Sequence, residues 1–482
     1  MYYPNIETIE ELHLKTGDLI PVYSEIDCGM ETPVTVYQKI GNTKYSFLLE
    51  SIEGESKLAR YSFIGSSPYK IIKTGKNEIL GSIDPLPLIQ EELKKFKQIA
   101  ISGLPRFVGG AVGFLSYELI HYFESRVKSH GADALNLPES IFMFTDTLVI
   151  FDHDRKKMIV LSLLQYDDNL PNNYQKCIKK INSLITKINS PLNLNKEKKL
   201  NLKQSKPVSN LSKSTYTKLV KAAKKYISDG DVIQVVLSQR IAKETFANPL
   251  DIYTALRSIN PSPYMYYFNF EEFQIIGASP EMLVRVEEGI VHTHPIAGTR
   301  PRGKNLTEDK ALEVELLNDE KEKAEHLMLV DLGRNDIGKV SKTGTVQLPQ
   351  FMEIERYSHV MHLVSHVQGE MRDDLNSFDA FRACFPAGTV SGAPKVRALE
   401  IISEFEPHIR GPYAGAVGYF SYSGNMDTAI AIRTIIISEN TAYVQAGAGI
   451  VYDSIPEIEY EETIHKASAL FKAIEKAEEG ND

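Results

Sequence analysis

The segment HTHPIAGTRPRG, residues 292–303, is the stretch around which the rest of the chain is organised. Residues 290–296 have the composition of a strand, and we expect the three residues that follow to end it abruptly. Gly298 allows the backbone to turn its N–H groups toward a ligand, Thr299 adds a hydroxyl group, and two arginines come next. Such a turn suits a small carboxylate. A plain surface turn with solvated arginines is the alternative that the rest of the chain has to exclude.

The overall composition is that of a globular protein without a nucleic-acid surface. A chain of 482 residues suggests about two to four domains. Its 43% of hydrophobic and 24% of charged residues are ordinary values. The net charge of −9 argues against general nucleic-acid binding, so an anionic substrate would need local arginines or a metal ion.

Targeting signals and cysteine pairs are not recognisable. No apolar run approaches the roughly 18 residues of a membrane span, and the acidic residues 5–11 do not resemble a secretion signal. Cys28, Cys177 and Cys384 are far apart, so we expect neither disulfides nor a thiolate zinc site. These features predict a cytoplasmic protein.

The first part of the chain is predicted to be mixed α/β with many short strands. Residues 46–51 and 61–65 have strand character. A glycine-rich run at residues 109–117 returns as residues 414–422. Glycine inside a strand marks a bulge or a close backbone approach, and the echo indicates two related sheets packed together unless it arose by chance.

A change of composition suggests where the chain divides. Lys, Asn and Ser dominate residues 167–210. Residues 174–188 could still form a helix, and the remainder is expected to be a flexible basic linker. We therefore predict an N-terminal domain at residues 1–166 and a catalytic domain at residues 211–482.

Two glutamates of the second half lie in segments with clear patterns. Residues 214–228 form an amphipathic helix. The strand at residues 273–277 leads to a Ser-Pro pair that is expected to cap a helix, which places Glu281 in the first helical turn. A long helical region at residues 308–333 carries Glu325 beside apolar residues. Helix-dipole complementation and simple exposure to water are the alternatives for these two acids.

Two further segments, one with histidines and one rich in glycine, are candidates for ligand binding. Residues 356–367 have strand composition, and strict alternation places His362 and His366 on the same face. A zinc pair and ordinary hydrogen-bonded histidines are the alternatives, but no third ligand is suitably spaced. The loop at residues 385–395 opens a helix and matches neither common nucleotide-binding motif, which argues against a nucleotide site.

Two further acids lie near the C-terminus. Residues 445–449 are expected to end a strand with bare N–H groups, and residues 454–457 start the last helix. Glu459 and Glu462 are three residues apart on that helix and share a face. Together they could chelate one Mg²⁺, and complementing the helix dipole is the alternative.

Five ordered segments together resemble the chorismate-utilising enzymes, and most closely the large subunits of anthranilate synthase. The resemblance is strongest over residues 212–472. It implies an α+β (mixed α/β) fold in which a two-sheet β-sandwich core is surrounded by helices. The segments that carry it are DVIQVVLSQR (231–240), PIAGTR (295–300), EHLMLVDLGRND (325–336), SGAPK (391–395) and QAGAG (445–449).

This resemblance implies a reaction and a set of site residues. Ammonia adds to the ring of chorismate as a hydroxyl leaves, and the aminated intermediate then loses pyruvate and becomes aromatic. Glu281 would protonate the leaving hydroxyl, and His362 would assist the later proton removal. Thr299 is the third implied catalytic residue. The implied substrate contacts are Gly298, Thr299, Tyr413, Arg433, Gly447, Ala448 and Gly449. The implied Mg²⁺ ligands are Glu325 and Glu462, with Glu459 acting through water.

Two single residues separate the members of this family. Isochorismate- and salicylate-forming members carry a lysine where this chain has Gln234, and aminodeoxychorismate-forming members commonly carry one where it has Ala297. Glutamine cannot act as the base that activates water, and alanine offers no nucleophile, so direct attack by ammonia is expected. An aminodeoxychorismate synthase of the folate pathway and a non-catalytic amino-acid sensor on the same fold are the alternatives.

The resemblance also implies a regulator and a partner. As enzymes of the first step of tryptophan biosynthesis, such proteins are inhibited by tryptophan, and Ser51, Pro263, Tyr264 and Met265 match the walls of its site. An aromatic core strand is the alternative for the last of these segments. No Gly-x-Cys-x-Gly elbow occurs in the chain, so ammonia is expected from a separate glutamine amidotransferase subunit.

Overall fold

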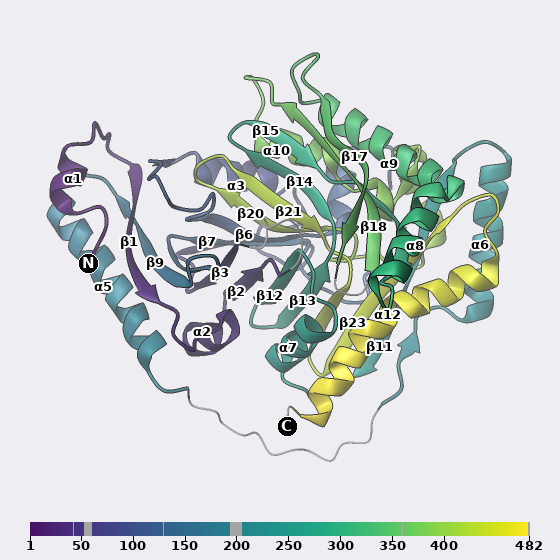
Figure 1. Ribbon diagram of the computed structural model, residues 1–482, viewed down its shortest axis with the longest axis horizontal. Coiled ribbons are helices and arrows are strands. Elements are labelled where there is room, and N and C mark those ends of the chain that lie inside the picture. Colours follow the sequence, from purple (N-terminus) through teal and green to yellow (C-terminus); the bar gives the residue numbers. More distant parts are fainter. Residues whose placement is uncertain (42, 53–59, 129, 193–204, 358–359, 481–482) are drawn as a thin grey trace.

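Two large β-sheets form the centre of the molecule (Figure 1). The computed structural model describes residues 1–482 except residues 42, 53–59, 129, 193–204, 358–359 and 481–482. The 13-stranded sheet runs in the order β10 (Val208–Ser209), β11 (Gln234–Glu244), β23 (Thr441–Ile450), β22 (Thr434–Ser438), β13 (Phe273–Ser279), β12 (Tyr264–Asn269), β2 (Ser46–Glu50), β3 (Tyr61–Ser66), β8 (Thr147–Asp152), β9 (Lys157–Gln165), β1 (Asp18–Asp27) and β5 (Lys97–Gln98), with β19 (Gly392–Ala393) on β11. The 10-stranded sheet runs in the order β16 (Ile296–Pro301), β18 (Val360–Glu370), β15 (Ile290–Thr293), β14 (Met282–Glu287), β21 (Met426–Ile430), β20 (Ala416–Ser421), β6 (Gly110–Leu115), β7 (Ser140–Thr145) and β4 (Lys70–Thr74), with β17 (Gln347–Arg356) on β18.

Helices surround these sheets, as Figure 1 shows. They are α1 (Ile6–Glu10), α2 (Pro33–Ile40), α3 (Leu86–Leu93), α4 (Ile120–Phe123), α5 (Leu170–Asn189), α6 (Lys213–Ser228), α7 (Pro249–Ile259), α8 (Leu306–Asn318), α9 (Glu320–Gly338), α10 (Ser377–Cys384), α11 (Lys395–Phe405) and α12 (Pro456–Glu479). The predicted mixed α/β fold with a two-sheet core is confirmed. None of the helices in the described ranges is both long and apolar enough to cross a bilayer.

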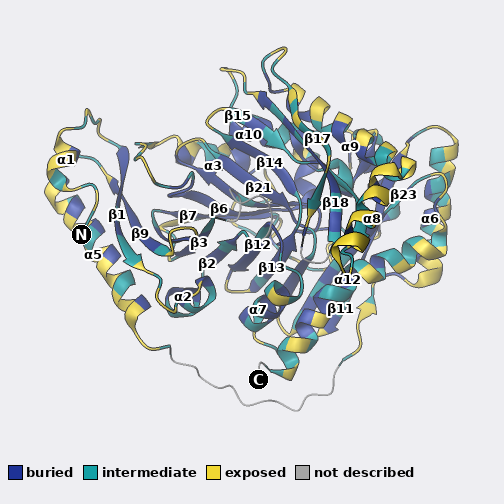
Figure 2. Cartoon of the chain, viewed as in Figure 1, coloured by how far each residue is buried: buried dark blue, intermediate teal, exposed yellow. Residues whose placement is uncertain are grey.

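The two sheets bury a common aromatic core between them. The Phe114 ring of one sheet lies 5.5 Å from Phe270 and 6.0 Å from Phe273, which belong to the other sheet and the turn that leads into it. A second core covers the opposite face of the larger sheet, beneath α2, α5, α7 and α12. Figure 2 shows buried residues running through both sheets, whereas the outer helix faces are exposed. Because both faces of the larger sheet are covered, strands such as β9 and β22 read as nearly continuous apolar runs.

Each sheet joins a block of strands from the N-terminal part of the chain to a block from the C-terminal part. Strand β2 pairs with β12, and β6 pairs with β20. The two echoing glycine-rich runs are therefore neighbours in one sheet, and the expectation that they form two packed sheets is wrong. Gly113 lies opposite Gly418 in this pairing, and a side chain on Gly113 would lie 1.8 Å from the Ile141 carbonyl oxygen. The backbones therefore approach each other closely at Gly113, as predicted, and only glycine leaves enough room.

The segment expected to be a linker contains a packed helix. Strand β9 leads into α5, which buries Leu170, Tyr174, Cys177, Ile181 and Ile188. The helix suggested at residues 174–188 is thus confirmed, and it belongs to the second core. The linker residues 193–204 lie outside the described residues, and β10 then pairs with β11. The division into domains at residues 1–166 and 211–482 remains a prediction about folding.

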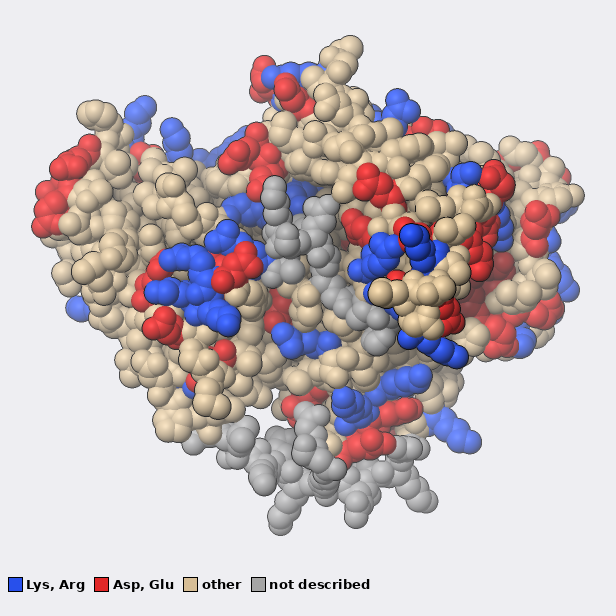
Figure 3. Space-filling view, viewed as in Figure 1, with Lys and Arg blue, Asp and Glu red and all other residues tan. Residues whose placement is uncertain are grey.

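Charged side chains of both signs lie close together on the surface. On the face shown in Figure 3, Lys and Arg side chains are intermingled with Asp and Glu. Many of them form ion pairs, such as Lys213 with Glu461 and Arg155 with Glu25. The absence of a general nucleic-acid surface remains a prediction.

Candidate active site and regulatory cavity

The Ala-Gly-Thr turn of the opening segment is a bulge inside a strand. Strand β16 runs from Ile296 to Pro301, and its register against β18 shifts between Ala297 and Thr299. The expectation that the strand ends there is wrong, because Gly298 has φ +66° and accommodates one extra residue. A side chain on Gly298 would lie 2.9 Å from Leu316, so the bulge also lets α8 pack closely.

The two arginines of this segment form ion pairs with acidic residues of the protein itself. Arg300 donates to Glu315 and to Asp319, each at 2.8 Å. Arg302 donates to Asp309 at 2.8 Å. All three acids belong to α8 or the residue after it, so the arginines fasten this helix to the strand. The anion contacts of the segment must come from its backbone and from Thr299.

His362 on β18 faces the bulge. Its Nδ1 lies 3.0 Å from the Gly298 carbonyl oxygen and 3.1 Å from the Thr299 hydroxyl. Because a carbonyl oxygen only accepts, Nδ1 carries the proton and Nε2 is the basic nitrogen. Burial lowers the pKa of His362, and the positive charge of Arg433 lowers it further. The expected strand at residues 356–367 is in fact the end of β17 and the start of β18, and residues 358–359 lie outside the described residues.

Arg433 and the C-terminal part of β23 lie on another side of the same space. Arg433 is buried and donates to the Lys466 carbonyl oxygen at 2.7 Å. A side chain on Gly447 would lie 2.9 Å from the Tyr413 hydroxyl. Strand β23 does not end at residues 445–449 as expected, because Gly447, Ala448 and Gly449 pair with β11. Its pairing with β22 stops at Val444, so the opposite edge of these glycines is open toward the site.

Lys466 was not identified from the sequence. Its ammonium group donates to the Gly447 carbonyl oxygen at 3.0 Å and pairs with Glu462 at 2.6 Å. The signal was present, since Lys466 follows Glu462 by four residues on α12 and so shares its helix face. This lysine places a positive charge beside the strand edge.

Glu281 lies in the turn between β13 and β14. The expected helix at this position is wrong, because the chain forms a strand again at Met282. The Thr389 hydroxyl of the glycine-rich loop donates to the Glu281 carboxylate at 2.8 Å. Burial raises the pKa of Glu281 to about 7, although Thr389 and the charge of Lys466 oppose this rise. A carboxyl group with such a pKa can donate a proton near neutral pH.

Two of the predicted magnesium ligands, Glu325 and Glu462, are each linked through one other side chain to a glycine of β23. The Glu325 carboxylate lies 3.4 Å from the Gln234 amide nitrogen, and that nitrogen lies beside Gly449. Lys466 connects Gly447 with Glu462 on α12. In the part of the chain that the structure describes, no group of three or more His, Cys, Asp or Glu side chains is ready to hold a metal ion.

Neighbouring carboxylates on α12 and on α9 repel one another, and a bound divalent cation would reduce this repulsion. Burial raises the pKa of Glu459, and the negative charge of Glu462 raises it further. Burial also raises the pKa of Glu322, and Glu325 adds to this rise. Glu322 is a further acid that the sequence did not reveal, although it precedes Glu325 by one turn of α9. Crowded oxygen ligands on two helices fit Mg²⁺.

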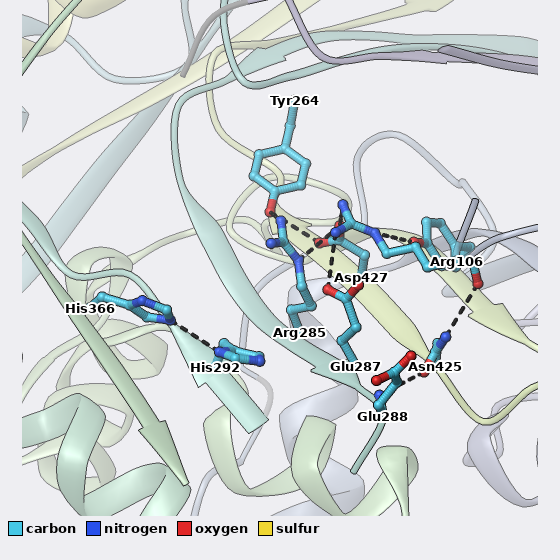
Figure 4. A network of polar contacts seen from close by, with 10 residues as sticks. Arg106, Tyr264, Arg285, Glu287, Glu288, His292, His366, Asn425 and Asp427 are labelled. Atoms are coloured by element: carbon cyan, nitrogen blue, oxygen red, sulfur yellow. Dashed lines mark hydrogen bonds and ion pairs between the residues drawn. The ribbon is translucent and has the colours of Figure 1, made fainter. Parts of the chain in front are cut away.

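A cavity of about 520 Å³ lies along β14 and is lined by Met282, Arg285 and Glu287 of that strand. All four predicted tryptophan contacts line it, namely Ser51, Pro263, Tyr264 and Met265. Its floor is a network that Figure 4 shows, in which Asp427 accepts hydrogen bonds from Arg106 (2.9 Å), Arg285 (3.1 Å) and Tyr264 (3.0 Å). This charged floor could not be found from the sequence, because its members are far apart along the chain.

Two acceptor atoms in the cavity wall lack partners. Glu50 Oε1 and Ser51 Oγ are buried and make no hydrogen bond to any described group. The other oxygen of Glu50 accepts from Tyr253 and from Arg257. A buried acceptor without a donor is costly, and a ligand with an ammonium group would satisfy both atoms.

Comparison with known proteins agrees with this fold. Residues 44–472 match the family model of chorismate binding enzymes, which is the class that the two-sheet fold and the site define. The chain is 50% identical to anthranilate synthase component 1 of Acetivibrio thermocellus, over 99% of this chain and 100% of that one. It is 48% identical to the component 1 protein of Aquifex aeolicus, over 99% of each chain. The chain belongs to the anthranilate synthase component 1 group of this family.

Solved structures support the same assignment. The crystal structure of anthranilate synthase component I from Streptococcus pneumoniae TIGR4 is 42% identical, with a TM-score of 0.77 over 87% of this chain and 95% of that one. The menaquinone-specific isochorismate synthase of Escherichia coli is 18% identical, with a TM-score of 0.72 over 97% of this chain and 98% of that one. The second similarity concerns the fold alone.

Proposed function

We propose that this chain is the large subunit of an anthranilate synthase, which converts chorismate and ammonia to anthranilate, pyruvate and water. The observation that supports the proposal is that Lys466 links three groups: its carbonyl oxygen accepts from Arg433, its ammonium group donates to the Gly447 carbonyl oxygen, and its charge acts on the carboxyl group of Glu281. An anion holder, backbone donors and a proton donor are what this reaction requires.

The carboxylates of chorismate would be held by Arg433 and by backbone N–H groups. A guanidinium binds a carboxylate through two parallel hydrogen bonds. Gly447, Ala448 and Gly449 add backbone donors at the open edge of β23, and Tyr413 adds a hydroxyl beside them. The backbone of the Gly298 bulge and the Thr299 hydroxyl would contact the other side of the ring.

Glu325 and Glu462 would hold Mg²⁺, with Glu459 and Glu322 close by. When bound, the ion neutralises substrate carboxylate charge and fixes the ring in place. Glu462 would then exchange its ion pair with Lys466 for the metal. That exchange would leave Lys466 available to the substrate.

Proton transfers would be divided between two residues. Protonated Glu281 gives its proton to the departing hydroxyl, which leaves as water while ammonia bonds to the ring. His362 Nε2 then accepts the ring proton as the enolpyruvyl group leaves and takes up a proton to become pyruvate. The low pKa of His362 keeps its imidazole neutral and ready to accept.

Two positions favour anthranilate over related products. Gln234 contacts Glu325 and has no basic nitrogen with which to activate water. Ala297 lies on β16 and offers no amine nucleophile. Ammonia would come from a glutamine amidotransferase subunit, as the component 1 designation of the relatives suggests.

Tryptophan would act as the feedback inhibitor in the cavity of about 520 Å³. Its ammonium group would meet Glu50 and Ser51, whose acceptor atoms lack donors. Its carboxylate would meet the arginines of the floor, and its indole would lie against the apolar side chain of Met265. Binding that favours an inactive arrangement would reduce turnover.

One assay tests the proposed activity. The purified chain is mixed with chorismate, an ammonium salt and Mg²⁺, and anthranilate fluorescence is followed. Anthranilate and pyruvate in equal amounts support the proposal, and Glu281→Gln should abolish both. A stable aminated product without pyruvate would indicate an aminodeoxychorismate synthase. No turnover together with tight tryptophan binding would indicate a sensor.

A further inference from the structure

His294 lies between two cavities that share it as a lining residue. It lines the cavity of about 520 Å³, and it also lines a cavity of about 40 Å³ together with Glu281 and Thr389. It occupies the connection between β15 and β16, directly before the segment that carries Gly298. His294 is therefore placed to contact a ligand on one side and the catalytic segment on the other.

The imidazole of His294 faces a buried carboxylate. Its Nε2 lies 3.4 Å from Glu355 Oε1 on β17. Neither atom makes a hydrogen bond with another described group, and the two are not aligned for one with each other. Burial raises the pKa of Glu355, but His294 and the Tyr357 hydroxyl outweigh this effect and lower it overall, so the carboxylate stays ionised. A small rotation of the His294 ring would complete or break this contact.

Glu355 is linked to His362 through Tyr357. The Tyr357 hydroxyl donates to Glu355 Oε2 at 2.8 Å. The Tyr357 ring packs edge-on against the His362 ring, with centroids 5.5 Å apart. The pairing of β17 with β18 also places Glu355 opposite His362. His362 is thus fixed by Gly298 and Thr299 on one side and by Tyr357 on the other.

We propose that Glu355 is a positioning residue for His362, acting through Tyr357, and that His294 couples this arrangement to the occupant of the larger cavity. The proposal rests on the proposed roles of His362 and of the cavity. A ligand in the cavity changes the orientation of His294 and therefore its contact with Glu355. Tyr357 then shifts, and the His362 ring leaves its productive orientation.

The first arm of the test concerns positioning. Glu355→Gln keeps the size of the side chain and removes its charge, and it should lower kcat about tenfold while changing the KM for chorismate less than about twofold. Tyr357→Phe removes only the connecting hydroxyl and should lower kcat in the same way. Glu353→Gln, two residues away and exposed on the same strand, is the matched control and should leave kcat unchanged. A kcat within about twofold of wild type for both Glu355→Gln and Tyr357→Phe would overturn the positioning role.

The second arm concerns coupling. His294→Gln should bind tryptophan with a Kd within about threefold of wild type by calorimetry, yet saturating tryptophan should leave about a third or more of the activity. In the double variant with Glu355→Gln, the residual inhibition should equal that of His294→Gln alone, since the two residues act in series. Full inhibition of His294→Gln would overturn the coupling role. Wild-type protein that does not bind tryptophan would refute the proposed regulation instead, while the first arm would still decide the role of Glu355.

Discussion

The Glu281 carboxyl group should reduce the stability of the folded protein at neutral and alkaline pH, and the Glu281→Gln variant tests this. Burial raises its pKa from 4.5 to about 7. The unfolded chain ionises near the ordinary value, whereas the folded chain keeps its proton up to about pH 7. Stability is therefore lost as the pH rises from about 4.5 to about 7, and the loss is constant above that range. The two values correspond to at most about 3 kcal/mol. The carboxyl group is enclosed but the residue as a whole is partly exposed, so we expect about 1–3 kcal/mol.

Thermal unfolding at two pH values measures this effect. At pH 8 the Glu281→Gln variant should unfold about 1–3 °C above wild type, given the length of the chain. At pH 5 the difference should shrink by more than half, because the unfolded carboxyl is then only partly ionised. Activity should meanwhile fall by about 10² or more, since the proton donor is lost. Glu353→Gln should change neither quantity. A variant that is less stable than wild type at pH 8, or equally stabilised at both pH values, would refute the reasoning.

Four other changes test separate parts of the molecule. Ser51→Ala should weaken tryptophan binding about tenfold by calorimetry and leave the uninhibited kcat unchanged, because it removes one acceptor in the cavity wall; unchanged inhibition would contradict the regulatory assignment. Arg433→Lys should raise the KM for chorismate about tenfold or more, because an ammonium cannot replace the planar fork; an unchanged KM would move the carboxylate elsewhere. Glu462→Gln should raise the Mg²⁺ concentration for half-maximal activity at least about tenfold, and an unchanged metal titration would remove Glu462 from the metal site. Arg410→Ala should lower the free energy of unfolding, measured in urea, by about 3–5 kcal/mol, because Glu406, the buried partner of Arg410 at 2.7 Å, is left without a positive charge. A loss below about 1 kcal/mol would show that this ion pair contributes little to stability.

Local patterns in the sequence were sufficient for several elements. Residues 214–228 read as an amphipathic helix, and α6 spans Lys213–Ser228 with Ser212 as its cap. Proline and the following acids predicted the start of α12 at Pro456. These features depend on neighbours within one or two helical turns, so the sequence contains the necessary information.

Local patterns misled where a contact from another part of the chain decides the conformation. Ser279 and Pro280 resemble a helix cap, yet Glu281 lies between two strands because β13 and β14 each pair with a distant strand. The arginines after Gly298 resemble anion holders, yet acids of α8 and Asp319 occupy them. Neither outcome depends on residues that are near in sequence.

The sequence by itself determined the class of the protein, the residue types of its site and the location of most helices. Residues such as Glu325, Arg433 and Gly447 could be named because the segments around them resemble those of a known enzyme family. Only the tertiary structure decided which of them meet, since the site joins segments on both sheets and on two helices. It alone also revealed the contact of Lys466 with Gly447. It likewise revealed the Arg106–Asp427 floor of the cavity of about 520 Å³, because strands from the two ends of the chain pair in one sheet.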